Sequence, residues 1–186
     1  MLTGSEIIKQ RENGNIVIKP FVKDRVQPNG YDITLGRYFY RYSNLLGSVY
    51  PSEENVDSIN KIFTLYDSYT GGFILRPYEK VLAHTNEVIG TNDFYVAELA
   101  TRSTLARYGV DICGSAGFGD VGYVNKWTIE LLNTTCNSIT LKSGMRVGQV
   151  YFTKLEGETN IIYDSYYNAN TDKEWKPEDM LPKRLT

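Results

Sequence analysis

The sequence contains few of the residues that build metal sites, disulfide frameworks or membrane spans. Its 186 residues include one histidine, His84, and two cysteines, Cys113 and Cys136. Two cysteines are too few for a disulfide scaffold or a conventional zinc site, so we expect two reduced thiols. No apolar run reaches the roughly 18 residues of a membrane-spanning helix, and the N-terminus lacks a signal peptide's apolar stretch. These absences predict a cytoplasmic protein that does not associate with membranes.

An excess of charge of one sign is also missing. The chain has 20 basic and 22 acidic side chains, for a formal net charge of -2. Without a net positive field to attract a polyanion, general nucleic-acid binding is disfavoured. The length is that of one domain, and we expect a single domain over residues 1–186.

Several catalytic motifs are absent as well. The chain has neither the H-x-E nor the P-C-x-x-C pattern of zinc deaminases, and it has no P-loop, G-x-G-x-x-G or G-x-S-x-G. A Ser-His-Asp arrangement would have to use His84, which lies in an expected strand. The residues that remain for chemistry are carboxylates, arginines and glycine-rich turns.

Short alternating segments separated by Gly, Asn and Pro, together with 15 tyrosines, predict a mainly β protein of the barrel or sandwich type. Two short helices are expected, Glu6–Arg11 with Ser5 as its cap and Ser103–Tyr108 with Gly109 as its C-cap. The polar tail from Asn168 is either a flexible end or a lid that orders on a ligand. The expected strands are Asn15–Lys19, Tyr31–Leu35, Arg37–Tyr42, Gly72–Arg76, Lys80–His84, Asp93–Leu99, Val110–Cys113, Lys126–Asn133, Ser138–Leu141 and Gln149–Lys154.

The stretch 100–133 concentrates the residues that carry chemistry. Arg102 and Ser103 open the second helix, where backbone N–H groups and a guanidinium can together hold an anion. Four glycines and Asp120 follow, and Glu130 lies within an apolar strand. Each feature has a plainer explanation: a surface helix, a turn-forming aspartate, and a glutamate that faces outward. Composition and spacing alone therefore indicate a β-rich protein with a candidate anion site.

Five ordered motifs of this chain resemble the deoxycytidine triphosphate (dCTP) deaminase branch of the trimeric dUTPase superfamily. The similarity runs from about Val26 to Lys154. The motifs are VQPNGYDITLG, FILRPYEKVLAHTNEVIG, ATRSTLARYG, AGFGDVGY followed by TIELLN, and SGMRVGQVYF. The resemblance implies a distorted jelly roll that assembles as a trimer with active sites between subunits, and a closed trimer would cover exposed strand edges.

The resemblance also implies a role for individual residues. Glu130 would be the proton shuttle of a metal-independent deamination, in which no zinc ion activates the water. Ser103 and carbonyls near Ser115 and Ala116 would hold the attacking water, and Arg107 would orient Glu130. The remaining implied contacts are Asp120 to the deoxyribose 3'-hydroxyl, Tyr123 beside the sugar, Arg102, Ser103, Thr104 and Gln149 at the triphosphate, and Asp32, which would hold Mg²⁺ through water.

The implied product is dUMP rather than dUTP. Deaminases that release dUTP usually carry a His-Arg pair where this chain has Gly117 and Phe118. Alternatives remain: a dUTPase in which Glu130 is structural, or a catalytically idle nucleotide-binding regulator. Family deaminases are often inhibited by dTTP, and the segment 113–115 is a candidate switch for that inhibition.

Two departures from the family pattern stand out. Gly119 replaces a branched aliphatic residue before Asp120, and the C-terminal motif is poorly matched. From about Tyr163 we expect a lid in which Tyr163 contacts the nucleotide and Lys173, or alternatively Lys176, supplies a cation, while Glu178 stands where a glutamine is expected. A carboxylate near a triphosphate is repulsive, so the lid would have to be built differently or be screened by magnesium.

Overall fold

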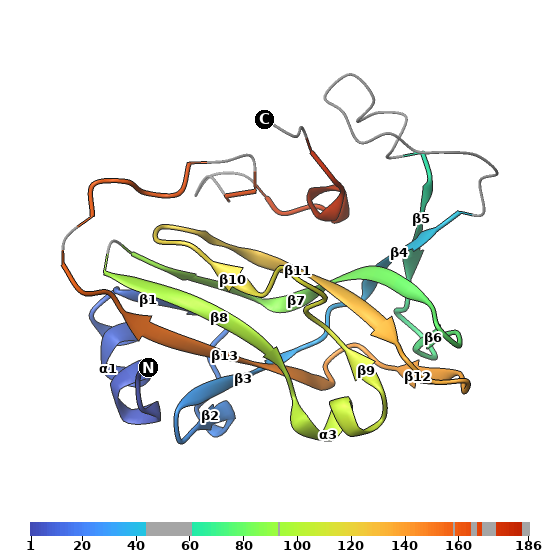
Figure 1. The fold of residues 1–186 in the computed structure, drawn as a ribbon, viewed down its shortest axis with the longest axis horizontal. Helices are drawn as coiled ribbons and strands as arrows, with labels where there is room; N and C mark the ends of the chain where they lie inside the picture. The colour runs from blue at the N-terminus through green and yellow to red at the C-terminus, as the bar shows by residue number, and fades with distance from the viewer. Residues whose placement is uncertain (44–60, 93, 158, 165–166, 169–173, 184–186) are drawn as a thin grey trace.

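The protein is a mainly β structure built from two packed sheets, as the sequence predicts (Figure 1). The computed structural model describes residues 1–43, 61–92, 94–157, 159–164, 167–168 and 174–183. The six-stranded sheet has the order β5-β4-β7-β11-β9, with β1 also paired to β7. The five-stranded sheet has the order β10-β8-β13-β3-β2, and β12 pairs with β6 in a small third sheet. The helices in the described ranges are too short or too polar to span a lipid bilayer.

The elements occupy the following residues. The six-stranded sheet comprises β1 (Ile16–Lys19), β4 (Tyr38–Tyr42), β5 (Phe63–Asp67), β7 (Lys80–Thr91), β9 (Val110–Asp111) and β11 (Val124–Asn133). The five-stranded sheet comprises β2 (Val26–Gln27), β3 (Gly30–Thr34), β8 (Tyr95–Thr101), β10 (Phe118–Gly119) and β13 (Arg146–Lys154). The other elements are α1 (Gly4–Glu12), η1 (Lys23–Arg25), β6 (Phe73–Leu75), α3 (Ser103–Arg107), β12 (Ile139–Leu141) and η3 (Pro177–Met180).

The main core lies between the two large sheets and is built by alternation along each strand. In β11 every second residue is buried, so Trp127, Ile129 and Leu131 face the core while Thr128 and Glu130 face outward. From the other sheet, Val150 and Phe152 are fully buried in the same cluster. The outer face of β11 is thereby left available for a site.

The structure corrects several expected boundaries. The N-terminal helix begins at Gly4 and is capped by Thr3, whose Oγ1 accepts a hydrogen bond from the Glu6 N–H, so Ser5 is not the cap. Strand β7 continues to Thr91 rather than ending at His84. The polar residues Thr85 and Glu87 within it are fully buried because they have hydrogen-bond partners inside the protein. Strand β5 was not predicted, because it is an edge strand and four of its five residues are exposed, so it lacks the alternation of a half-buried strand.

The C-terminal segment folds back across the outer face of the six-stranded sheet (Figure 1). Met180 and Leu181 form a second, small hydrophobic cluster with Tyr40 of β4 and Leu82 of β7. The Trp175 ring lies 4.4 Å from the His84 ring, measured between centroids. This segment therefore covers the face of the sheet that carries Glu130. We call its described residues, 163–164, 167–168 and 174–183, the C-terminal roof.

Candidate active site

The outward face of β11 and the C-terminal roof enclose a cavity of about 380 Å³. We call it the Glu130 cavity. Among the residues singled out from the sequence, it brings together Ala116, Asp120, Tyr123, Glu130 and Tyr163. Its full lining is Tyr42, Leu82, Ala116, Phe118, Asp120, Tyr123, Trp127, Thr128, Glu130, Tyr163, Tyr167, Met180 and Pro182. A half-enclosed cavity with aromatic walls and few polar groups is typical of a small-molecule site.

Glu130 has one oxygen anchored and the other free. Its Oε2 is buried and lies 2.7 Å from the Nζ of Lys80, at the start of β7. A Cβ atom at Gly114 would lie 2.4 Å from that same oxygen, so only glycine fits there without a shift. No hydrogen bond to Oε1 is present in the described residues. The carboxylate is therefore held by one oxygen while the other is available to a ligand.

Aromatic rings form the wall of the cavity beside Asp120. Tyr123 packs edge-on against both Trp127 and Tyr163, with ring centroids 5.6 and 5.2 Å apart. Burial raises the pKa of Tyr123 well above its usual range, so the phenol stays neutral. A Cβ at Gly119 would lie 2.5 Å from the Trp127 ring, which explains why glycine replaces the expected aliphatic residue. The volume lost at position 119 is occupied by Trp127.

Hydrogen bonds hold the start of the C-terminal segment against the turn before β11. The Asn168 side chain accepts from the Val124 N–H and donates to the Gly122 carbonyl. The Tyr163 N–H donates to the Val121 carbonyl at 2.8 Å. These contacts fix Tyr163 at the cavity, where the sequence placed it. Lys173, the other predicted lid contact, lies outside the described residues.

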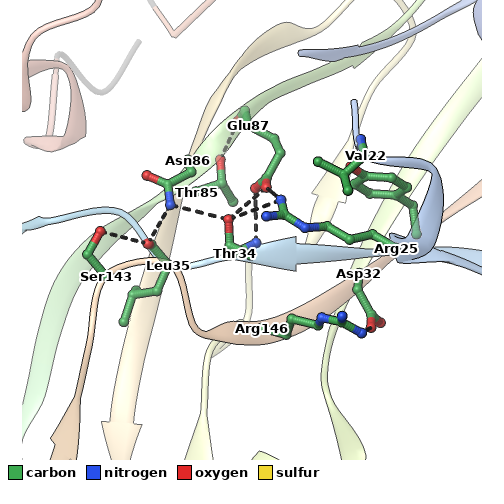
Figure 2. Close-up of polar contacts among 11 residues, drawn as sticks. Val22, Arg25, Asp32, Thr34, Leu35, Thr85, Asn86, Glu87, Ser143 and Arg146 are labelled. Carbon is green, nitrogen blue, oxygen red and sulfur yellow. Dashed lines mark hydrogen bonds and ion pairs between the residues drawn. The ribbon is translucent and has the colours of Figure 1, made fainter. Parts of the chain in front are cut away.

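A second candidate site lies on the five-stranded sheet. There Asp32, with a fully buried side chain, accepts a 2.9 Å hydrogen bond from Gln149 Nε2. Guanidinium nitrogens of Arg102 and Arg146 lie 3.6 and 3.4 Å from its Oδ2. Figure 2 shows the pair formed by Asp32 of β3 and Arg146 of β13. We call these four residues the Asp32 cluster; its arginines are suited to an anion such as a phosphate.

A buried ion pair supports the strand that carries Asp32 (Figure 2). The Glu87 carboxylate is fully buried and lies 2.5 Å from Arg25 NH1. It also accepts hydrogen bonds from the N–H and the hydroxyl of Thr34. Because Thr34 is two residues after Asp32, this network fixes the strand on which the cluster is built.

Helix α3 presents three of the predicted residues to solvent. Ser103, Thr104 and Arg107 are exposed, and the described part of the chain offers their side chains no hydrogen bond or ion pair. None of them lines the Glu130 cavity. Their predicted roles at the water, at the phosphates and beside Glu130 therefore need a partner that one chain does not supply.

The surroundings of Asp32 do not suit direct binding of a metal ion. Two guanidinium groups and an amide already surround its carboxylate. The described residues contain no group of three or more His, Cys, Asp or Glu that could hold a metal. A magnesium ion, which prefers phosphate oxygens and water, would have to be held mainly by the nucleotide. The prediction that Asp32 reaches it through water stays a prediction.

His84 has a structural role. Its Nδ1 lies 2.8 Å from the Thr85 carbonyl and its Nε2 accepts from the Tyr38 N–H, so both ring nitrogens are occupied. Burial lowers the pKa of His84 to about 4. The ring is neutral at physiological pH and packs against Trp175.

Comparison with known proteins identifies the family. The family model described as "dCTP deaminase-like" matches residues 1–155. A "dCTP deaminase, dUMP-forming" of Streptomyces coelicolor is 34% identical over 166 residues, covering 89% of this chain and 85% of that protein. The chain belongs to the dCTP deaminase-like family. The family assignment made from five motifs is thus confirmed.

Further comparisons agree with this assignment. A "dCTP deaminase, dUMP-forming" of Clostridium botulinum is 32% identical over 171 residues, covering 91% of each chain. Among solved structures, a dCTP deaminase from Agrobacterium tumefaciens aligns with a TM-score of 0.63 and 19% identity. It covers 81% of this chain, which spans 45% of that chain. This likeness confirms the fold.

Two residues of the site were missed in the sequence. Lys80 contacts Glu130 although 50 positions separate them, and only the register of β7 against β11 brings them together. Trp127 reaches the cavity from a strand interrupted by a register shift between Lys126 and Thr128. A single sequence carries no signal for either, because both contacts depend on how two distant strands pair.

Proposed function

We propose that this protein hydrolyses dCTP to dUMP, ammonia and diphosphate. The observation that carries the proposal is Glu130, a carboxylate with one anchored and one free oxygen in a half-enclosed cavity. Relatives 32–34% identical over most of the chain bear the name dCTP deaminase, dUMP-forming. Asp120 and Tyr123 beside Glu130 supply the groups expected to bind the deoxyribose.

In the proposed reaction, Glu130 Oε1 takes a proton from water as the oxygen attacks C4 of the cytosine ring. The proton passes to the ring nitrogen N3, and a second transfer through the same carboxyl group leads to loss of ammonia. The net change is dCTP plus water to dUTP plus ammonia. Hydrolysis by a second water then releases diphosphate and leaves dUMP.

The residues after Ala116 support dUMP as the product. A Cβ at Gly117 would lie 2.7 Å from the Leu99 carbonyl oxygen, so a bulky residue does not fit there without a backbone shift. Phe118 lines the Glu130 cavity. The His-Arg pair associated with dUTP release would therefore require a different loop.

We further propose that a neighbouring subunit completes the site in a homotrimer. The Glu130 cavity and the Asp32 cluster share no lining residue, and the α3 side chains have no partner within the described chain. A neighbour's α3 placed at the cavity mouth would bring Ser103 and Arg107 to the water and Arg102 to the phosphates. The nucleotide would carry Mg²⁺ on its phosphates, so excess EDTA is expected to abolish diphosphate release.

The test is a product-resolved assay. Purified protein with magnesium and dCTP is expected to give dUMP and ammonia, separated by chromatography. Glu130→Gln is expected to slow ammonia release by about 10²–10⁴-fold while retaining dCTP binding, because a general acid–base group contributes that much. Glu12→Gln, which changes an exposed glutamate at the end of α1, is the matched control. Full turnover by Glu130→Gln, or hydrolysis of dUTP alone by the wild type, would contradict the proposal.

A further inference from the structure

Lys80 is the charged group that holds Glu130 within one chain. Strands β7 and β11 run antiparallel, with Glu130 opposite Leu82 and Leu132 opposite Lys80. Lys80 and Glu130 are therefore diagonal neighbours on one face of the sheet, which is within reach of two long side chains. Their Nζ and Oε2 atoms lie 2.7 Å apart.

The contact fixes which oxygen of the carboxylate meets a ligand. Oε2 is buried between the ammonium group and the backbone at Gly114. A half-turn of the carboxylate about its Cγ–Cδ bond only exchanges its two oxygens. In either case one oxygen stays on Lys80 and the second faces the cavity. The contact is an ion pair, and the attraction between the two full charges keeps this oxygen beside the ammonium group.

The contact with Glu130 also keeps Lys80 in its charged form. The hydrogen bond to Glu130 raises the pKa of Lys80, so the ammonium group stays charged. Tyr42 lies next to both groups, and burial raises the pKa of its phenol. The other titratable groups that face Glu130 are Cys113, whose pKa burial raises to about 11, and Asp120 across the cavity. Lys80 is thus the only cation among these facing groups in the described residues.

We infer that Lys80 is a positioning residue for the deamination: it orients Glu130 so that the free oxygen can accept the proton of the attacking water. This inference rests on the proposed function. Lys80 does not touch the substrate in this arrangement and keeps its own proton throughout the reaction. Lys80 lies within the second motif, FILRPYEKVLAHTNEVIG, but the resemblance assigns it no role at the site.

The test compares Lys80→Met, Lys80→Gln and Lys80→Arg with the wild type in ammonia release from dCTP. We expect Lys80→Met and Lys80→Gln to lower kcat about tenfold to hundredfold, part of the 10²–10⁴ that a general acid–base group supplies, with little change in KM. Lys80→Arg is expected to restore most of the rate, because it retains the charge and the reach. Lys154→Met, at the exposed end of β13, is the matched control.

One further readout, besides the split between kcat and KM and the rescue by Lys80→Arg, separates positioning from a structural role. In a Glu130→Gln background, Lys80→Met is expected to cause no further loss, because both changes act through one carboxylate.

Each failure has a distinct meaning. A wild type that releases no ammonia from dCTP would overturn the proposed function. An active wild type whose Lys80→Met and Lys80→Gln variants turn over normally, or lose the same factor in the Glu130→Gln background, would overturn only the role of Lys80.

Discussion

The Glu130 cavity and the Asp32 cluster each contain one carboxylate, and the two carboxylates are held in opposite ways. Asp32 is fully buried and surrounded by an amide and two guanidinium groups. Glu130 has one oxygen on Lys80 and another facing a cavity with aromatic walls. A carboxylate whose oxygens are all engaged can only position its neighbours, whereas one with a free oxygen can move a proton. The environment, rather than the residue type, assigns the roles.

The largest expected effect on stability separates the two carboxylates directly. Asp32→Ala should lower the free energy of unfolding by about 3 kcal/mol, because it leaves the half-buried amide of Gln149 and two arginines without their acceptor. Glu130→Ala should cost about 1 kcal/mol or less, since Lys80 is 45% exposed and can be hydrated in its place. Urea unfolding at one protein concentration measures both. Equal losses would contradict the assigned roles.

The next largest effect is the dependence of the free energy of unfolding on pH, and it concerns His84, the one histidine of the sequence. Burial lowers the pKa of His84 from 6.5 to about 4, so the unfolded chain binds a proton that the folded chain does not. The stability that neutral His84 contributes is complete above pH 6.5 and falls as the pH drops toward 4. Between pH 6.5 and 5 the loss is about 2 kcal/mol.

Urea unfolding at several pH values, with Trp fluorescence as the signal, measures this slope. In His84→Gln the slope between pH 6.5 and 5 should be reduced, because carboxylates titrate mostly below that window. An unchanged slope in the variant would show that another group is responsible.

The smallest effect concerns the fit between Gly119 and Trp127. Gly119→Val should lower the free energy of unfolding by about 1–2 kcal/mol, because its Cβ would lie 2.5 Å from the Trp127 ring. The double variant Gly119→Val/Trp127→Leu should recover part of that loss, since the smaller side chain makes room. A double variant that loses the sum of the two single changes would indicate that the contact is not what excludes valine.

Much of the fold follows from the sequence, for local reasons. Alternation placed β1, β3, β4, β11 and β13 within a few residues of their bounds, because each has one face on the core. The extent of β7 could not be predicted, since the buried Glu87 carboxylate is satisfied by Arg25 and Thr34, which lie 62 and 53 residues away in the chain. Polar residues in a strand look like a loop until their distant partners are known.

The candidate site was predicted in part. The family resemblance named the residues of both regions, and the structure places Ala116, Asp120, Tyr123, Glu130 and Tyr163 at one cavity. It did not bring Ser103 or Arg107 to that cavity, because α3 faces solvent in a single chain. Lys80 escaped prediction because its contact depends on the register of two strands.

The roof over the cavity has a consequence for how the protein behaves on dilution. Met180 and Leu181 pack on Tyr40 and Leu82 of the same chain, and Tyr163 pairs with the backbone at Val121. A contact within one chain is not governed by mass action, unlike a contact between subunits. Dilution that separates an oligomer would remove any residues borrowed from a neighbour, but each released chain would retain its own roof.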